Sequence, residues 1–162
     1  MSGRHRRSVV RRRRLVAGAL VLGVVAAGII VWRSHRSPIV LPDDPCASPP
    51  PLVTRGGVTL QAAALAAFRA AERQSGRRIP VVWSYRSCAQ QRAACRDICD
   101  DPGGCPGLCA PPGRSWHQLG AAIDTTSTAL LDRAIVRALL DNGWCQPLPA
   151  TDPGHFSFAG CH

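Results

Sequence analysis

Acidic residues are absent from the first 36 positions of this chain, where nine arginines occur. Residues 37–162 contain eleven arginines and ten acids, so the net charge of +10 divides into +9 before position 37 and +1 after it. A nucleic-acid-binding module needs its cations on the folded face that meets the phosphates. Because the body of the protein has no such excess of positive charge, we predict that nucleic acid is not a partner.

Charge of either sign is also absent from Leu15–Trp32, a run of eighteen residues. As a helix this run would be about 27 Å long, close to the hydrocarbon thickness of a bilayer, about 30 Å. We predict a transmembrane signal-anchor at 15–32, with the basic tail 1–14 in the cytoplasm and the C-terminal body outside the cell membrane. The alternative is a cleaved signal peptide, but its apolar part is normally shorter and a small-x-small cleavage site follows it, whereas here Trp-Arg-Ser-His follows.

Apolar periodicity is absent from residues 33–58, which contain six of the fourteen prolines. This composition predicts a stiff, extended linker between the membrane and a folded domain. Residues 59–162 contain no internal repeat and are enough for one small domain, of a size that often needs covalent cross-links.

All eight cysteines follow the apolar run: Cys46, Cys88, Cys95, Cys99, Cys105, Cys109, Cys145 and Cys161. An even number on an extracytoplasmic chain indicates disulfides. The closely spaced run from Cys95 to Cys109 is also compatible with a zinc knuckle, although the oxidising compartment favours a stapled loop. We expect this run to pair within itself and Cys145 to pair with Cys161. Eight free thiols would instead indicate a metal-storage or redox protein.

Helical and extended patterns follow one another irregularly after position 58, which predicts a small α+β domain. The predicted helices are one capped by Thr59 and ending near Gly76, one at Gln90–Cys99, and one at Thr128–Asn142 capped by Gly143. The predicted strands are Arg78–Tyr85, with Pro80 at an edge or a strand start, a buried strand at Ala121–Asp124, and a last strand at His155–Phe158.

His117 and Asp124 are seven positions apart, and in an uninterrupted strand this odd separation would point them to opposite faces. A bend at Gly120 would let them converge and offer zinc one nitrogen and one oxygen ligand. A histidine near a turn is more often a hydrogen-bonded surface residue, so this pair needs support from other segments.

The segment Asp152-Pro-Gly-His155 supplies a second candidate pair. Pro then Gly at the central positions predicts a β-turn, with glycine adopting the positive φ of type II, so that the Cα atoms of Asp152 and His155 lie within about 7 Å. His155 can then bind a metal while Asp152 acts as general base. Taken alone, the segment is more typical of a surface turn that starts with Asp.

A third segment places Arg86 at the end of a predicted strand, where an arginine usually makes a surface ion pair. Together the segments resemble the VanY-like zinc D-alanyl-D-alanine carboxypeptidases, whose pattern is Y-R-S-x-x-x-Q, then S-x-H-x-x-G-x-A-x-D, then an acidic residue followed by x-x-H-F. The matching residues are Tyr85-Arg86-Ser87 with Gln91, Ser115-x-His117-x-x-Gly120-x-Ala122-x-Asp124, Asn142-Gly143-Trp144 and Asp152-x-x-His155-Phe156.

The resemblance implies a hedgehog/D-Ala-D-Ala peptidase-like fold, a small antiparallel sheet with flanking helices. It also implies zinc bound by His117, Asp124 and His155, with Asp152 as the catalytic base. By the same resemblance Arg86 acts in catalysis and, with Ser115, contacts the substrate or the oxyanion, and Gln91 and Tyr85 join the substrate-binding residues.

Two features depart from the family pattern. Most of these carboxypeptidases have Glu where this chain has Asp152, although related endopeptidases use Asp, and the only glutamate, Glu72, lies on a predicted helix away from the motif. The Cys-rich insertion at 88–113 is not part of the pattern either, and we expect it to reshape the substrate groove.

The expected function is a zinc-dependent D,D-carboxypeptidase that removes the terminal D-Ala from the peptide stems of peptidoglycan. A peptidoglycan endopeptidase of the same fold and a catalytically weak wall-binding domain are the alternatives.

Overall fold

The computed structural model describes residues 39–106, 108–126 and 132–161. In this part the chain forms a small α+β domain, as predicted, with the order β1 (Val53–Arg55), β2 (Val58–Leu60), α2 (Ala62–Ser75), β3 (Val81–Trp83), α3 (Cys88–Cys99), β4 (Ala122–Thr125), α5 (Arg133–Asp141), β5 (Trp144–Cys145) and β6 (His155–Phe158). The predicted basic tail and the 15–32 anchor lie outside the described residues. Within the described part, no helix combines the length and apolar character needed to cross a bilayer.

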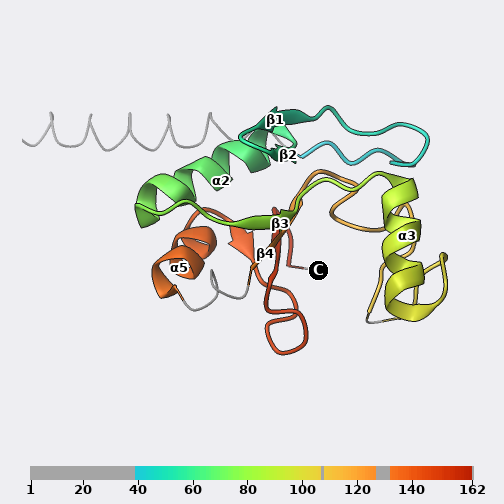
Figure 1. The fold of residues 1–162 in the computed structure, drawn as a ribbon. Coiled ribbons are helices and arrows are strands. Elements are labelled where there is room, and N and C mark those ends of the chain that lie inside the picture. The colour runs from blue at the N-terminus through green and yellow to red at the C-terminus, as the bar shows by residue number, and fades with distance from the viewer. Residues whose placement is uncertain (1–38, 107, 127–131, 162) are drawn as a thin grey trace, which may run out of the picture. The chain divides into compact units, whose positions relative to one another are not determined.

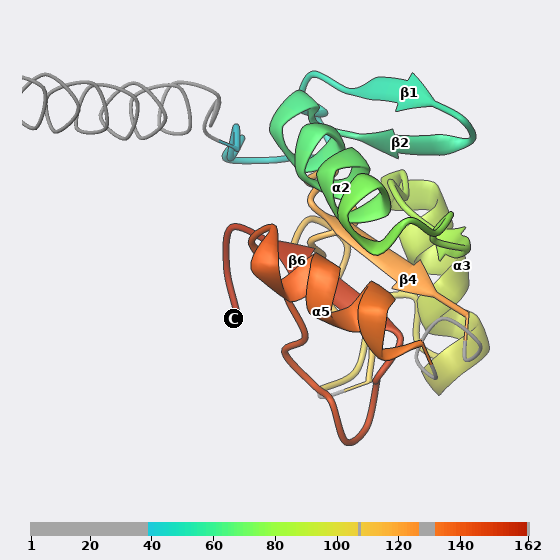
Figure 2. The same ribbon diagram turned by 90° about the vertical axis from the view of Figure 1, so that its left-hand side faces the viewer.

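Four antiparallel strands form the main sheet in the order β3-β4-β6-β5 (Figure 1). β3 occupies an edge, as Pro80 indicated, and a register irregularity interrupts its pairing with β4. Helices α2 and α5 lie against each other on one side of the sheet, and α3 lies on the opposite side (Figures 1 and 2). The sheet therefore separates the main hydrophobic core from the Cys-rich half of the domain.

The core lies between the sheet and the helices α2 and α5. Phe68 of α2 and Trp144 of β5 are buried and meet edge to face, with ring centroids 6.4 Å apart. Ile123 and Phe156 are fully buried on the neighbouring central strands β4 and β6. Burial of an apolar side chain of this size contributes about 1.5–3 kcal/mol, so the core holds β4 and β6 in a fixed register.

The start of α2 differs from the prediction. Thr59 is not a helix cap but the middle residue of β2, paired with Thr54 across a turn at Gly56-Gly57, where both glycines have positive φ. The N-cap of α2 is Gln61, whose side chain makes no cap and instead bonds the backbone at Val40 and Leu119. The β-branched run before the helix favours the hairpin over an earlier helical turn, while Gly76 ends α2 in the left-handed conformation, as predicted.

Residues 39–58 are not the extended linker that their prolines predicted, because they pack onto the domain. The β1–β2 hairpin begins in this segment, Val58 is buried in the core, and Cys46 is bonded to Cys88. Proline excludes regular helix and central strand but does not prevent packing when a disulfide and a hairpin fix the chain.

The eight cysteines form four disulfides, Cys46–Cys88, Cys95–Cys109, Cys99–Cys105 and Cys145–Cys161. The predictions that Cys145 pairs with Cys161 and that the central four pair locally are both confirmed. The zinc-knuckle alternative is excluded, because no cysteine of this run is free.

The helix predicted at 128–142 forms at Arg133–Asp141, capped by the Asp132 side chain, and its predicted first turn falls among residues outside the described part. Gly143 follows it with positive φ, as expected. The two-residue strand β5 was not predicted, because a pair of residues carries no periodicity.

Candidate metal centre and catalytic site

The loop before β4 directs His117 inward. The Ser115 side chain accepts a hydrogen bond from the His117 backbone, and the turn closes through Gly120, whose N–H donates to the His117 carbonyl at 3.0 Å. Gly120 has φ +61°, and a Cβ there would lie 2.4 Å from a methyl carbon of Leu52 and 3.1 Å from the Gln61 nitrogen. The predicted bend is therefore present, and both its conformation and its close packing require glycine.

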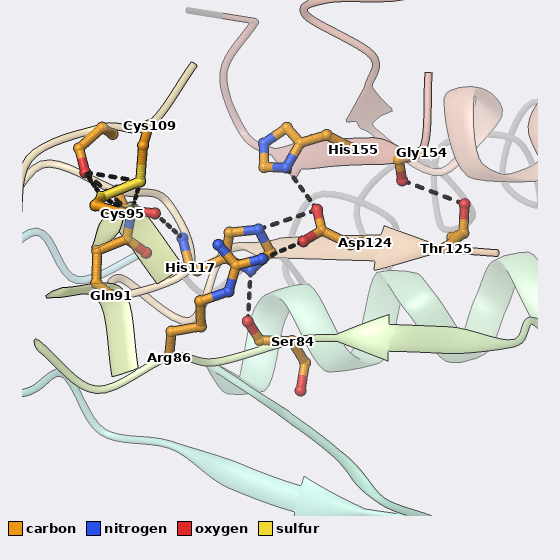
Figure 3. A network of polar contacts seen from close by, with 12 residues as sticks. Ser84, Arg86, Gln91, Cys95, Cys109, His117, Asp124, Thr125, Gly154 and His155 are labelled. Carbon is orange, nitrogen blue, oxygen red and sulfur yellow. Dashed lines mark hydrogen bonds and ion pairs between the residues drawn. A yellow bond between two sulfur atoms is a disulfide. The ribbon is translucent and has the colours of Figure 1, made fainter. Parts of the chain in front are cut away.

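Asp124 and His155 are direct partners in the register of β4 and β6, which places their side chains together. His117, Asp124 and His155 each present a ligand atom, and these atoms all lie within 4.8 Å of one another. Figure 3 shows both imidazoles directed at the Asp124 carboxylate. The three residues predicted as metal ligands thus converge.

The turn that carries Asp152 and His155 forms, with a 3.2 Å bond from the His155 N–H to the Asp152 carbonyl. Gly154 does not have the positive φ of the predicted type II turn. Glycine is favoured at position 154 for a different reason, close packing. A Cβ there would lie 3.0 Å from the Thr125 carbonyl oxygen, and the Gly154 carbonyl accepts a hydrogen bond from the Thr125 N–H. This close approach fastens the turn to the end of β4.

The hydrogen bond at Nδ1 of His117 leaves Nε2, the other ring nitrogen, able to bind a metal. Nδ1 lies 2.6 Å from the carbonyl of Ser84, which can only accept, so Nδ1 carries the proton. In neutral His117 the lone pair on Nε2 then faces Oδ1 of Asp124 at 3.1 Å, and Nδ1 of His155 lies 2.9 Å from the same oxygen. Lone pairs that face one another need a cation between them, and two imidazoles with a carboxylate suit zinc.

Burial and neighbouring charges act on the same residues. Burial lowers the pKa of His117, although the hydrogen bond and charge of Asp124 act in the opposite direction. Burial alone would raise the pKa of Asp124, but the imidazoles of His117 and His155 beside it and the charge of Arg86 outweigh burial and hold that pKa well below its usual range. The site therefore keeps His117 neutral and Asp124 ionised near neutral pH, the states that bind a metal.

Arg86 contacts Asp124 directly. Its Nη2 donates to Oδ2 of Asp124 at 2.5 Å, and its guanidinium lies over the Trp83 ring, 5.2 Å from the centroid. Burial lowers the pKa of Arg86, against the charges of Asp124 and Asp152, which raise it. Arg86 thus compensates the negative charge of Asp124 through Oδ2, the carboxylate oxygen that the two imidazoles do not contact.

The other predicted site residues lie in different surroundings. Ser115 is buried and borders the site cavity, whereas Tyr85 is half-buried and is not among the residues that line that cavity. Gln91 is buried, and its amide donates to the Ala110 carbonyl at 2.9 Å, so it fastens the Cys-rich loop to α3. Asp152 is exposed and lines the cavity beside His155.

A cavity of about 880 Å³ opens over the three candidate ligands. It is bordered by the site residues, by the loop before β6 and by the Cys-rich insertion, as the departure from the family pattern led us to expect. Sequence reasoning missed Arg114 and Leu148 among its lining residues, because neither belongs to a motif. Their contribution depends on how the two loops fold over the site.

The solved structure of VanYB in complex with D-alanine-D-alanine is similar to this chain, with a TM-score of 0.52 and 17% sequence identity, over 68% of this chain and 78% of VanYB. No protein-family model matches the sequence. No curated protein matches it either. The chain thus shares the fold of VanYB, and its His-Asp-His group could hold a metal at the site described above.

Proposed function

We propose that this protein is a zinc-dependent D,D-carboxypeptidase that removes the terminal D-Ala from peptidoglycan stem peptides. The observation that carries the proposal is the convergence of His117, Asp124 and His155 beside Asp152 in a cavity of a VanY-like fold. The ligand bound in the structure of VanYB, D-alanine-D-alanine, supports this substrate class.

His117, Asp124 and His155 would hold the ion. Bound zinc would polarise the scissile carbonyl and make a water molecule more acidic. Asp152 accepts the proton from the attacking water and returns it to the leaving amine. Arg86 holds Asp124 in its ionised state, and its guanidinium, which also lines the cavity, would stabilise negative charge that develops at the scissile carbonyl.

We also propose that the 15–32 segment anchors the chain in the cell membrane, with the domain on the outer side. Seven arginines precede the segment and only two, Arg33 and Arg36, closely follow it, and this excess of positive charge before the segment supports the orientation. The four disulfides of the described part are consistent with an oxidising compartment. An anchored enzyme of this kind would meet the peptide stems of the wall close to the membrane.

The test is incubation of the full chain, in mild detergent and loaded with zinc, with a pentapeptide stem ending in D-Ala-D-Ala, with and without a chelator. We expect the loss of one alanine in the mass spectrum, abolished by the chelator and restored by added zinc. A cut inside the stem would identify an endopeptidase, an alternative favoured by the aspartate at position 152. Binding without cleavage would identify a wall-binding domain and refute the proposal.

A further inference from the structure

The Cys-rich insertion forms one wall of the site cavity. Ile98, Leu108 and Ala110 line the cavity from this segment. Two disulfides, Cys95–Cys109 and Cys99–Cys105, staple the segment, and the Gln91 amide bonds the Ala110 carbonyl (Figure 3). The wall is therefore held in place against α3.

The surface of this wall is apolar although it is open to solvent. Ile98 is 53% exposed and Leu108 71% exposed, and both line the cavity. Val82 of β3 and Leu148 of the loop before β6 are likewise exposed and line the same cavity. Large apolar side chains gathered around one concave site are typical of a ligand-binding surface.

Arg114 adds a positive charge beside this surface. It lines the cavity, it is exposed, and it makes no ion pair among the residues that the structure describes. The other arginine of the cavity, Arg86, is already paired with Asp124. Arg114 is three residues before His117, a separation of at most about 11 Å along the chain, so its side chain can reach a group bound next to the metal ligands.

We propose that the stapled insertion forms a subsite for the C-terminal residue of a peptide, in which Arg114 binds the terminal carboxylate and Leu108 contacts the small apolar side chain. This rests on the proposed function and names the feature that makes the enzyme act at a chain end. Guanidinium recognises a carboxylate through two parallel hydrogen bonds, and the neutral amide of the same peptide cannot form this charged pair.

The experiment measures binding by calorimetry to the full, zinc-loaded chain carrying Asp152→Asn, in which we expect turnover to be at least about 100-fold slower. The probes are a stem pentapeptide with a free C-terminal carboxylate and the same peptide as its C-terminal amide. We expect the free acid to bind about 10- to 100-fold more tightly than the amide. Arg114→Gln should reduce this ratio to near one, and Arg114→Lys should keep part of it. Arg92→Gln is the matched control, because Arg92 is an exposed arginine of α3 that does not line the cavity.

A ratio that stays unchanged in Arg114→Gln overturns the proposal, as does a ratio near one in the parent protein or the absence of binding by both peptides. An equal loss of the ratio in Arg92→Gln would also overturn it, because net charge alone would then explain the effect. Failure of the proposed function is a separate result: it would appear as the lack of hydrolysis by the zinc-loaded chain that retains Asp152, whatever the binding ratio.

Discussion

One carboxylate, Asp124, connects the residues of the site. Its Oδ1 faces His117 and His155, and its Oδ2 accepts from Arg86. The exposed Asp152 lies at the same cavity but outside the group whose atoms could share an ion. The two aspartates are therefore suited to different roles, metal ligand and proton acceptor, because Asp124 is partly buried between two imidazoles and a guanidinium whereas Asp152 is open to solvent.

This difference predicts that two substitutions both reduce turnover but differ in their effect on zinc binding. His117→Ala should lose zinc and with it all chelator-sensitive activity, because it removes a buried ligand. Asp152→Asn should keep zinc but lower kcat by at least about 100-fold, the usual contribution of a general base. Zinc content after dialysis and the rate of alanine release measure the two effects. A near-normal rate in Asp152→Asn would contradict the role assigned to this carboxylate.

At the scale of elements, the bend at Gly120 links the fold to the site. The positive φ and the 3.1 Å approach to the Gln61 nitrogen make an alanine at this position both strained and crowded. We expect Gly120→Ala to lower the free energy of unfolding by about 1–3 kcal/mol and to weaken zinc binding, because His117 is held by the same turn. Gly57→Ala is the control: its φ is also positive, but nothing lies within 4 Å of the added methyl group.

Chemical denaturation and zinc titration of both variants provide the measurements. The control should show a stability loss from backbone strain without a change in zinc affinity. Unchanged zinc affinity in Gly120→Ala would show that the bend does not position His117.

Local sequence signals predicted much of the site and less of its surroundings. The bend at Gly120 and the strand at His155 could be predicted because each depends on a few neighbouring residues. The β1–β2 hairpin and the true start of α2 could not, because Thr59 is placed by pairing with Thr54, a contact that helix propensity ignores. The roles of Gln91 and Arg86 also needed the structure, since their partners, Ala110 and Asp124, are distant in sequence.

We predict that removing a disulfide costs more stability the longer the loop that it closes. Cys46–Cys88 joins residues 42 apart and Cys99–Cys105 joins residues 6 apart. In the chain-entropy model these loops contribute about 4 and about 2 kcal/mol. Replacing the first pair with serine should therefore lower the free energy of unfolding more than replacing the second, as measured by urea titration. Equal losses, or a larger loss for the short loop, would show that native packing rather than loop length sets their contribution.

At the scale of the whole molecule, the buried charges of the site couple folding to pH. The pKa of His117 in the folded chain lies below its ordinary value of 6.5, so the unfolded chain binds more protons as the pH falls below about 6.5. The pKa of Asp124 lies below its ordinary value of 3.8, so its contribution is present above that pH and is lost only at lower pH. Both shifts therefore make the folded chain less stable as the pH falls, but they do so in separate ranges of pH.

The metal-free chain should accordingly be equally stable at about pH 7 and pH 8, lose stability from about pH 6.5 downward, and lose more below about pH 4. Zinc should steepen the first loss, because protons compete with the ion for the imidazoles. Urea unfolding across this range, with and without zinc, measures both. His117→Gln is the decisive comparison, since removing the imidazole should flatten the profile just below about pH 6.5 and should reduce but not abolish the loss below about pH 4, because His155 and Arg86 still lower the pKa of Asp124. If the variant and the parent chain showed the same slope in the upper range, the buried imidazole would not be the group that couples folding to pH.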